Sequence, residues 1–172
     1  MALQRLPISA GWSFKQANTS AASFLPVSQF PTTIHQDLFH HGKIVDPFLD
    51  ANESRVQWVG EEAWTYRTKF SKPKVQSKNM SFELVFEGLD THSTIFLNSK
   101  EIQKTDNMFL EYRVDISKLI EEENELEIRF ESTFLVGRRM EKEAKAKPLF
   151  CHNGDQSRLQ VRKAPYSYGW DW

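Results

Sequence analysis

The sequence lacks most features that mark secreted, membrane-spanning or nucleic-acid-binding proteins. Its 172 residues include a single cysteine, Cys151, so no disulfide can form within the chain. No apolar run approaches the roughly 18 residues of a membrane-spanning helix, and the formal net charge of −1 creates no overall field for nucleic acid. The opening MALQRLPISAGW has no apolar stretch typical of a secretory signal. We therefore expect an intracellular protein, cytoplasmic or vacuolar/lysosomal-like, with neither nucleic acid nor a membrane as partner.

Familiar catalytic and metal-binding motifs are also missing. The chain contains no G-x-S-x-G elbow, no G-x-x-x-x-G-K-[ST] loop and no H-E-x-x-H pair. His35, His40 and His41 are five and six residues apart, whereas two ligands on one helix face need a spacing of four. Cys151 and His152 are neighbours in sequence, which does not bring a base to a thiolate. We expect no metal, no cofactor and no catalytic machinery within these residues, and His40 and His41 to be packing or capping groups.

Aromatic residues are abundant, and many lie in segments where apolar and polar residues alternate. Aromatic side chains make up 13% of the chain, and they favour strands. Period-two alternation indicates strands buried on one face, and it occurs at residues 64–70, 81–86, 112–116 and 124–130, while the segment 93–102 has apolar residues on both faces before a turn. The short spacing between these segments suits antiparallel connections. The pattern predicts an all-β fold, a β-sandwich formed by one domain spanning residues 1–172, with one or two short helices.

The remaining segments allow four more local predictions. A short aromatic strand is expected in residues 9–16, a small helix at Gln36–His41, and a last strand at 158–163. The segment 135–147 predicts a helix with i,i+4 Glu–Lys pairs on its surface, either solvated or docking a partner. Asn98 and Ser99 predict a hairpin turn, looser than the tight turn that Asn-Gly favours.

The last residues form a dense aromatic and acidic cluster. Trp170, Asp171 and Trp172 follow closely on Tyr166 and Tyr168. Aromatic rings can stack on the apolar faces of sugars while a carboxylate accepts hydrogen bonds from the hydroxyls. The same residues could also form a core corner or an interface patch, and residue types alone leave these alternatives open.

Several segments together resemble the N-terminal domain of β-mannosidases of glycoside hydrolase family 2. They are FPTTIHQDL, DPF, WVGEEAWTYRTKF, FEGLDTHSTIFLN, DNMF, YRVDI, NELEIRFES and RKAPYSYGWDW, which together cover almost the whole chain. The terminal QVRKAPYSYGWDW looks most specific to the mannosidase branch, and the missing signal is similar to the intracellular fungal type. The resemblance implies a galactose-binding-like jelly-roll sandwich, followed in the complete enzyme by further sandwich domains and a (β/α)₈ barrel. That barrel, absent from this chain, would carry both catalytic glutamates of a retaining mechanism.

The resemblance also implies a role for the terminal motif. Trp170 and Asp171 would reach the barrel's active site, where Asp171 binds hydroxyls of a terminal mannose and Trp170 shapes the pocket wall. Trp172 is included as their neighbour, although the family's usual Gly-Pro continuation is not present. We thus expect a non-catalytic domain of a β-mannosidase that acts on terminal non-reducing β-D-mannose residues, with β-mannoside oligosaccharides and the barrel as partners. Two alternatives remain open, a stand-alone carbohydrate-binding module and a sandwich that only docks to partners.

Overall fold

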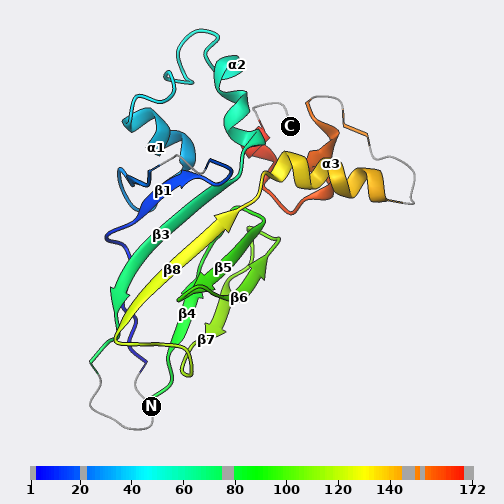
Figure 1. The fold of residues 1–172 in the computed structure, drawn as a ribbon. Coiled ribbons are helices and arrows are strands. Elements are labelled where there is room, and N and C mark those ends of the chain that lie inside the picture. Colours follow the sequence, from blue (N-terminus) through cyan, green and yellow to red (C-terminus); the bar gives the residue numbers. More distant parts are fainter. Residues whose placement is uncertain (1–2, 20–22, 75–79, 145–149, 152–153, 169–172) are drawn as a thin grey trace.

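A computed structural model describes residues 3–19, 23–74, 80–144, 150–151 and 154–168, and its core is built from antiparallel strands. A six-stranded sheet has the order β2-β1-β3-β8-β5-β6, and β4 pairs with β7 in a second sheet (Figure 1). The strands are β1 Ser13–Gln16, β2 Leu25–Pro26, β3 Trp64–Ser71, β4 Glu83–Phe86, β5 Ser93–Leu97, β6 Lys100–Thr105, β7 Tyr112–Asp115 and β8 Glu123–Phe130. The predicted all-β sandwich is confirmed, with two sheets of unequal size.

Short helices complete the fold. The α-helices are α1 Ile34–His40, α2 Glu53–Val56 and α3 Thr133–Glu143, and the 3₁₀ helices are η1 Gln57–Glu61, η2 Gln156–Gln160 and η3 Pro165–Tyr168. Among the described residues, no helix is long and apolar enough to cross a membrane.

The central strands β3 and β8 set which side chains face the core. Tyr66 lies opposite Ile128 and Thr68 opposite Leu126 in the antiparallel register. Because directly opposed residues share a face, the apolar positions of both strands point the same way. Leu126 and Ile128 pack there with Leu84 and Phe86 of β4, which covers this part of the sheet.

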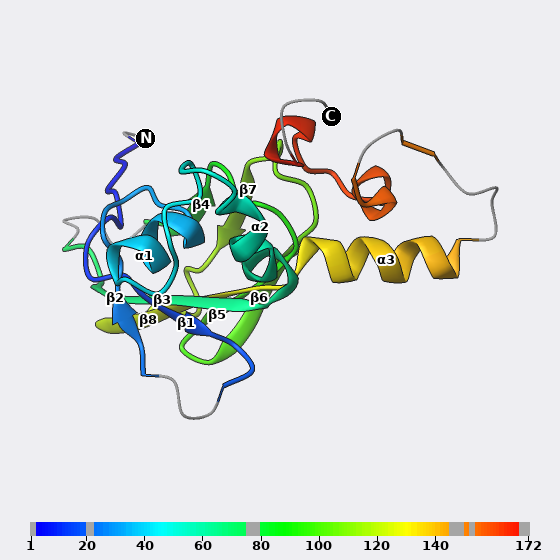
Figure 2. The same cartoon turned by 90° about the horizontal axis from the view of Figure 1, so that it is seen from above.

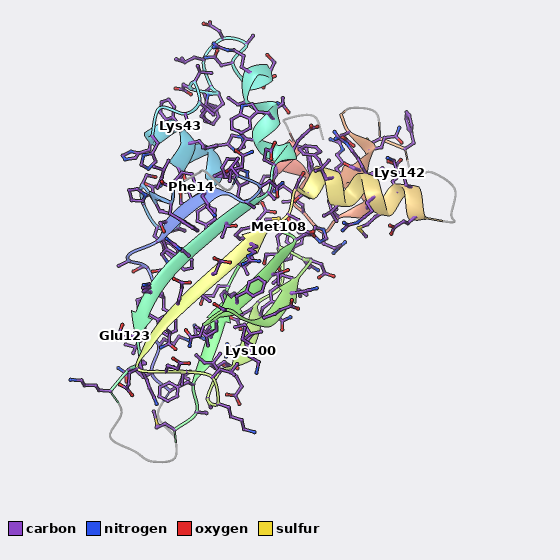
Figure 3. The ribbon with its side chains drawn as sticks, viewed as in Figure 1. Phe14, Lys43, Lys100, Met108, Glu123 and Lys142 are labelled. Carbon is purple, nitrogen blue, oxygen red and sulfur yellow. The ribbon has the colours of Figure 1, made fainter. Side chains whose placement is uncertain are left out.

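A second apolar cluster lies beside the first on the same face of the six-stranded sheet. Phe14 lies opposite Tyr66 and packs with Leu38 of α1, Val59 and Trp64. Figure 3 shows Phe14 between the sheet and the helical region. Seen from above in Figure 2, α1, α2, β4 and β7 lie on one side of this sheet. The sandwich therefore has one shared inner face covered partly by helices and partly by the smaller sheet.

The outer face of the six-stranded sheet is polar, with cations placed over aromatic rings. The guanidinium of Arg67 lies 3.6 Å from the centroid of the Phe24 ring, and that of Arg129 lies 4.3 Å from the Phe96 ring. Such contacts cover apolar rings while the charges stay in water.

Two helix predictions are confirmed with shifted boundaries. Helix α1 begins at Ile34, ahead of the expected Gln36, because Thr33 and Gln36 form a reciprocal capping box. Helix α3 begins at Thr133 because the Ser132 side chain accepts a hydrogen bond from the Leu135 amide, and it ends at Glu143. The lysines of the expected surface ion pairs lie at 145 and 147, outside the described residues.

Two other predictions are wrong. Residues 158–163 do not form a strand, because the Asp155 side chain caps Ser157 and starts η2, and only Arg162 makes a parallel bridge, to Asn107. The hairpin turn is tight rather than loose, since Asn98 and Ser99 have positive φ values of 51° and 66° between paired Leu97 and Lys100. The Asn98 side chain accepts from the Glu125 amide at 2.9 Å, a contact with β8 that stabilises this conformation despite Ser99.

Candidate functional site

The sequence places the candidate sugar-binding residues at the end of the chain, beyond the described part. Trp170, Asp171 and Trp172 all lie outside the described residues, so their predicted role stays a prediction. The structure does describe the segment that leads to them, residues 154–168, which we call the terminal segment. Within it Tyr166 is exposed and Tyr168 is half-buried.

The middle of the terminal segment is fixed to the connection between β6 and β7. The Met108 amide donates to the Arg162 carbonyl at 3.1 Å, and the Ala164 amide lies 2.9 Å from the Met108 sulfur. Figure 3 labels Met108 at the end of the sheet nearest α3. Lys163 forms an ion pair with Asp90, which precedes β5, and Ala164 is buried. These contacts hold the segment against the sandwich just before η3.

The last described residue packs against α3. The Tyr168 ring meets the Phe134 ring edge-on, with centroids 5.5 Å apart. Its hydroxyl is buried and has no hydrogen-bond partner within the described part of the chain. Burial, followed by the nearby charges of Asp90 and Asp155, raises the pKa of Tyr168 to about 12. Tyr168 is therefore neutral at physiological pH and acts as a packing anchor.

A cavity of about 180 Å³ lies where α3, η1 and the terminal segment meet. It is lined by Gln57, Glu61, Phe134, Arg138, Gly154, Asp155, Arg158 and Tyr168. Arg138 donates from Nε to Asp155 Oδ2 at 2.7 Å and from Nη2 to Glu61 Oε1 at 2.8 Å. Both carboxylates are thus held by one guanidinium, an arrangement that fixes positions rather than transfers protons.

The pKa shifts in this cavity have the same structural origin. The pKa of Arg138 is raised by its hydrogen bonds to Glu61 and Asp155. Burial alone would raise the pKa of Asp155, but hydrogen bonds from Ser157 and Arg138 outweigh it, so the pKa is lowered. Arg138 and Asp155 therefore remain ionised around neutral pH.

The histidines have structural surroundings. His41 follows α1 as its C-cap, lies 2.7 Å through Nε2 from the Pro26 carbonyl, and contacts the Phe14 ring, in agreement with the packing interpretation. His40 meets His41 edge-on. His35 lies near the terminal segment, where burial and then Lys163 lower its pKa. In the described residues no group of three histidine, cysteine or acidic side chains could hold a metal ion.

Sequence reasoning missed the residues that hold the terminal segment. Lys163 and Asp90 are 73 positions apart, and Arg138 and Glu61 are 77 apart. Local periodicity carries no signal for pairs so distant in sequence. The segments that contain Asp90, Lys163 and Glu61 take part in the family resemblance, as FEGLDTHSTIFLN, RKAPYSYGWDW and WVGEEAWTYRTKF, but the resemblance does not say which of their residues meet.

Comparison with known sequences gives consistent matches along the whole chain. Beta-mannosidase B of Thermothelomyces thermophilus is 48% identical over 168 residues, 97% of this chain and 20% of that protein. Beta-mannosidase B of Aspergillus clavatus is 43% identical over 174 residues, with 99% and 20% covered. The chain thus spans about a fifth of the length of these relatives.

Solved structures agree with the fold. The crystal structure of the β-D-mannosidase from Dictyoglomus thermophilum matches with a TM-score of 0.86 and 40% identity, covering 97% of this chain and 20% of that one. An exo-chitosanase from Amycolatopsis orientalis matches at a TM-score of 0.61 and 19% identity over 73% of this chain and 16% of that one, which shows the fold alone. The family model described as glycosyl hydrolase 2 galactose-binding domain-like matches residues 12–172. The chain belongs to this galactose-binding-like domain family of the family 2 glycosyl hydrolases.

Proposed function

We propose that this chain is the N-terminal, non-catalytic domain of a β-mannosidase that hydrolyses terminal non-reducing β-D-mannose residues with retention of configuration. The observation that carries the proposal is the 48% identity to a beta-mannosidase B across 97% of the chain. The proposed unit is one domain over residues 1–172, docked on a (β/α)₈ barrel that supplies both catalytic glutamates. Its substrates would be short β-mannoside oligosaccharides.

The domain's contribution would be to place a loop against the substrate. In this proposal Asp171 accepts hydrogen bonds from the hydroxyls of the terminal mannose, while Trp170 and its neighbour Trp172 form part of the pocket wall. The packing of Tyr168 on Phe134 supports this idea, because it fixes the described segment up to two residues before Trp170. Correct orientation is valuable in catalysis, since a misplacement of about 1 Å can cost roughly a hundredfold in rate.

The cellular role follows from the proposed substrate. Removal of terminal β-mannose belongs to carbohydrate and polysaccharide catabolism and to the degradation of N-glycans. We place the protein inside the cell, in the cytoplasm or a vacuolar or lysosomal-like compartment. Cell fractionation with an antibody to the sandwich would test that location.

Kinetics of the complete reading frame test the proposal. The full polypeptide is expected to release mannose from a nitrophenyl β-mannoside, whereas residues 1–172 alone are expected to give no turnover. Asp171→Ala in the full polypeptide should lower kcat/KM by about a hundredfold or more, with Asp171→Asn intermediate. A reading frame that ends without a barrel, combined with saccharide binding by this chain, would instead indicate a stand-alone carbohydrate-binding module. Unchanged kinetics for Asp171→Ala would refute the role of the terminal loop.

A further inference from the structure

We propose that Arg138 is a positioning residue, which fixes the start of the terminal segment against α3 and η1 and so contributes to placing the substrate-contacting loop. This inference rests on the proposed function for its catalytic consequence. Its structural part concerns only described residues and can be tested on the 172-residue chain itself.

Arg138 connects three elements that are distant in sequence. From α3 its guanidinium reaches Glu61 of η1 at 2.8 Å and Asp155, at the start of the terminal segment, at 2.7 Å. The other carboxylate oxygen of Asp155 accepts from the Ser157 amide at 2.9 Å. The carboxylate that binds Arg138 thus also caps η2, so the guanidinium and the start of the terminal segment are rigidly coupled.

The helix that carries Arg138 is itself fixed to the sandwich. The Ser132 hydroxyl donates to the Gly60 carbonyl at 2.8 Å and accepts from the Leu135 amide at 3.2 Å. Phe134 packs so closely on Gly60 that a Cβ there would lie 2.9 Å from its ring. The same Phe134 ring receives the Tyr168 ring edge-on. Because α3 is fixed in this way, Arg138 holds the start of the terminal segment in a defined position relative to the sandwich.

Exposure indicates a role in position rather than in stability. The side chains of Arg138 and Glu61 are 39% and 50% exposed, and that of Asp155 is 22% exposed. Ion pairs at such partly solvated sites add little to folding stability. Loss of Arg138 should thus leave the sandwich folded while the terminal segment shifts or loosens. Such a shift lowers the catalytic rate where a loop must meet a substrate.

Amide hydrogen exchange on the 172-residue chain tests the structural part. Arg138→Ala is expected to speed exchange at Ser157 and Ser167 by about fivefold to tenfold, with the melting temperature nearly unchanged. The matched control is Arg139→Ala, because Arg139 pairs only distantly with Glu131, at 4.0 Å, and both side chains are 58% exposed. Arg138→Lys should restore slow exchange in part, since an ammonium cannot reproduce both contacts. Unchanged exchange in Arg138→Ala would overturn the inference whatever the enzyme does.

A double-mutant cycle in the full polypeptide tests the catalytic part. Arg138→Ala should lower kcat/KM about tenfold to a hundredfold in the native background, and less than about threefold when Asp171 is already alanine. Arg139→Ala should leave kcat/KM unchanged in both backgrounds. Equal losses in both backgrounds would show that Arg138 does not act through the loop and would overturn the inference. A full polypeptide without mannosidase activity would refute the proposed function instead, and the exchange measurement would then decide the role of Arg138.

Discussion

Replacing Gly137 by alanine tests how closely α3 approaches the terminal segment. A Cβ added at this position would lie 2.4 Å from the Ser157 carbonyl oxygen and 2.8 Å from the Ser157 Cβ. Ordinary contacts of this kind are longer than about 3.4 Å, and backbone atoms cannot rotate away as a flexible side chain can. The helix and η2 must therefore separate to admit the methyl group.

The expected magnitude is the difference of two opposing effects. Alanine in place of glycine within a helix stabilises it by about 1 kcal/mol, whereas overpacking a tight contact costs about 1–3 kcal/mol. Because the contact involves backbone, we expect the upper part of that range. The net loss is then about 1–2 kcal/mol, and a loss of 1 kcal/mol lowers the melting temperature of a chain this long by about 2–4 °C.

Thermal and urea unfolding of the 172-residue chain provide the measurement. Gly88→Ala is the control, because no heavy atom lies within 4 Å of its added Cβ, and it should change the free energy of unfolding by less than about 0.5 kcal/mol. A higher melting temperature for Gly137→Ala would mean that helix propensity alone decides the outcome. That result would refute the close packing of α3 on η2.

Two further predictions concern buried polar groups. Asp37 is fully buried and accepts hydrogen bonds from the Ser28 amide at 2.9 Å and the Tyr66 hydroxyl at 3.1 Å, so Asp37→Ala should lower the free energy of unfolding in urea by about 3 kcal/mol; a loss below about 1 kcal/mol would contradict this. Burial lowers the pKa values of His35 and His92 in the folded chain. As the pH falls through about 6.5, the unfolded chain therefore binds more protons than the folded chain, and the free energy of unfolding decreases. The melting temperature should fall between pH 7.5 and 5.5, and a His35→Gln/His92→Gln double variant should flatten that dependence; an equal slope in both proteins would exclude these histidines as the cause.

The strands were predictable because strand side chains alternate with a fixed period of two. The segments 64–70 and 124–130 have mostly apolar residues at every second position, and they form β3 and β8 with those residues on the inner face. The sequence also held the signal for the start of α1, since Thr33 and Gln36 have the capping-box spacing. The strand prediction at 158–163 was wrong because a cap at Asp155 started a 3₁₀ helix instead.

The sequence by itself determined the class of the domain, through periodicity, and its family, through motifs spread along the chain. It also supplied Asp171 as a hypothesis for sugar contact, which stays a prediction. Only the tertiary structure decided what holds the terminal segment, because Lys163 meets Asp90, and Arg138 meets Glu61, across more than 70 intervening positions. Local pattern depends on the repeat of one strand or helix, whereas such contacts depend on how the sheets and α3 pack, and no spacing in the sequence encodes that packing.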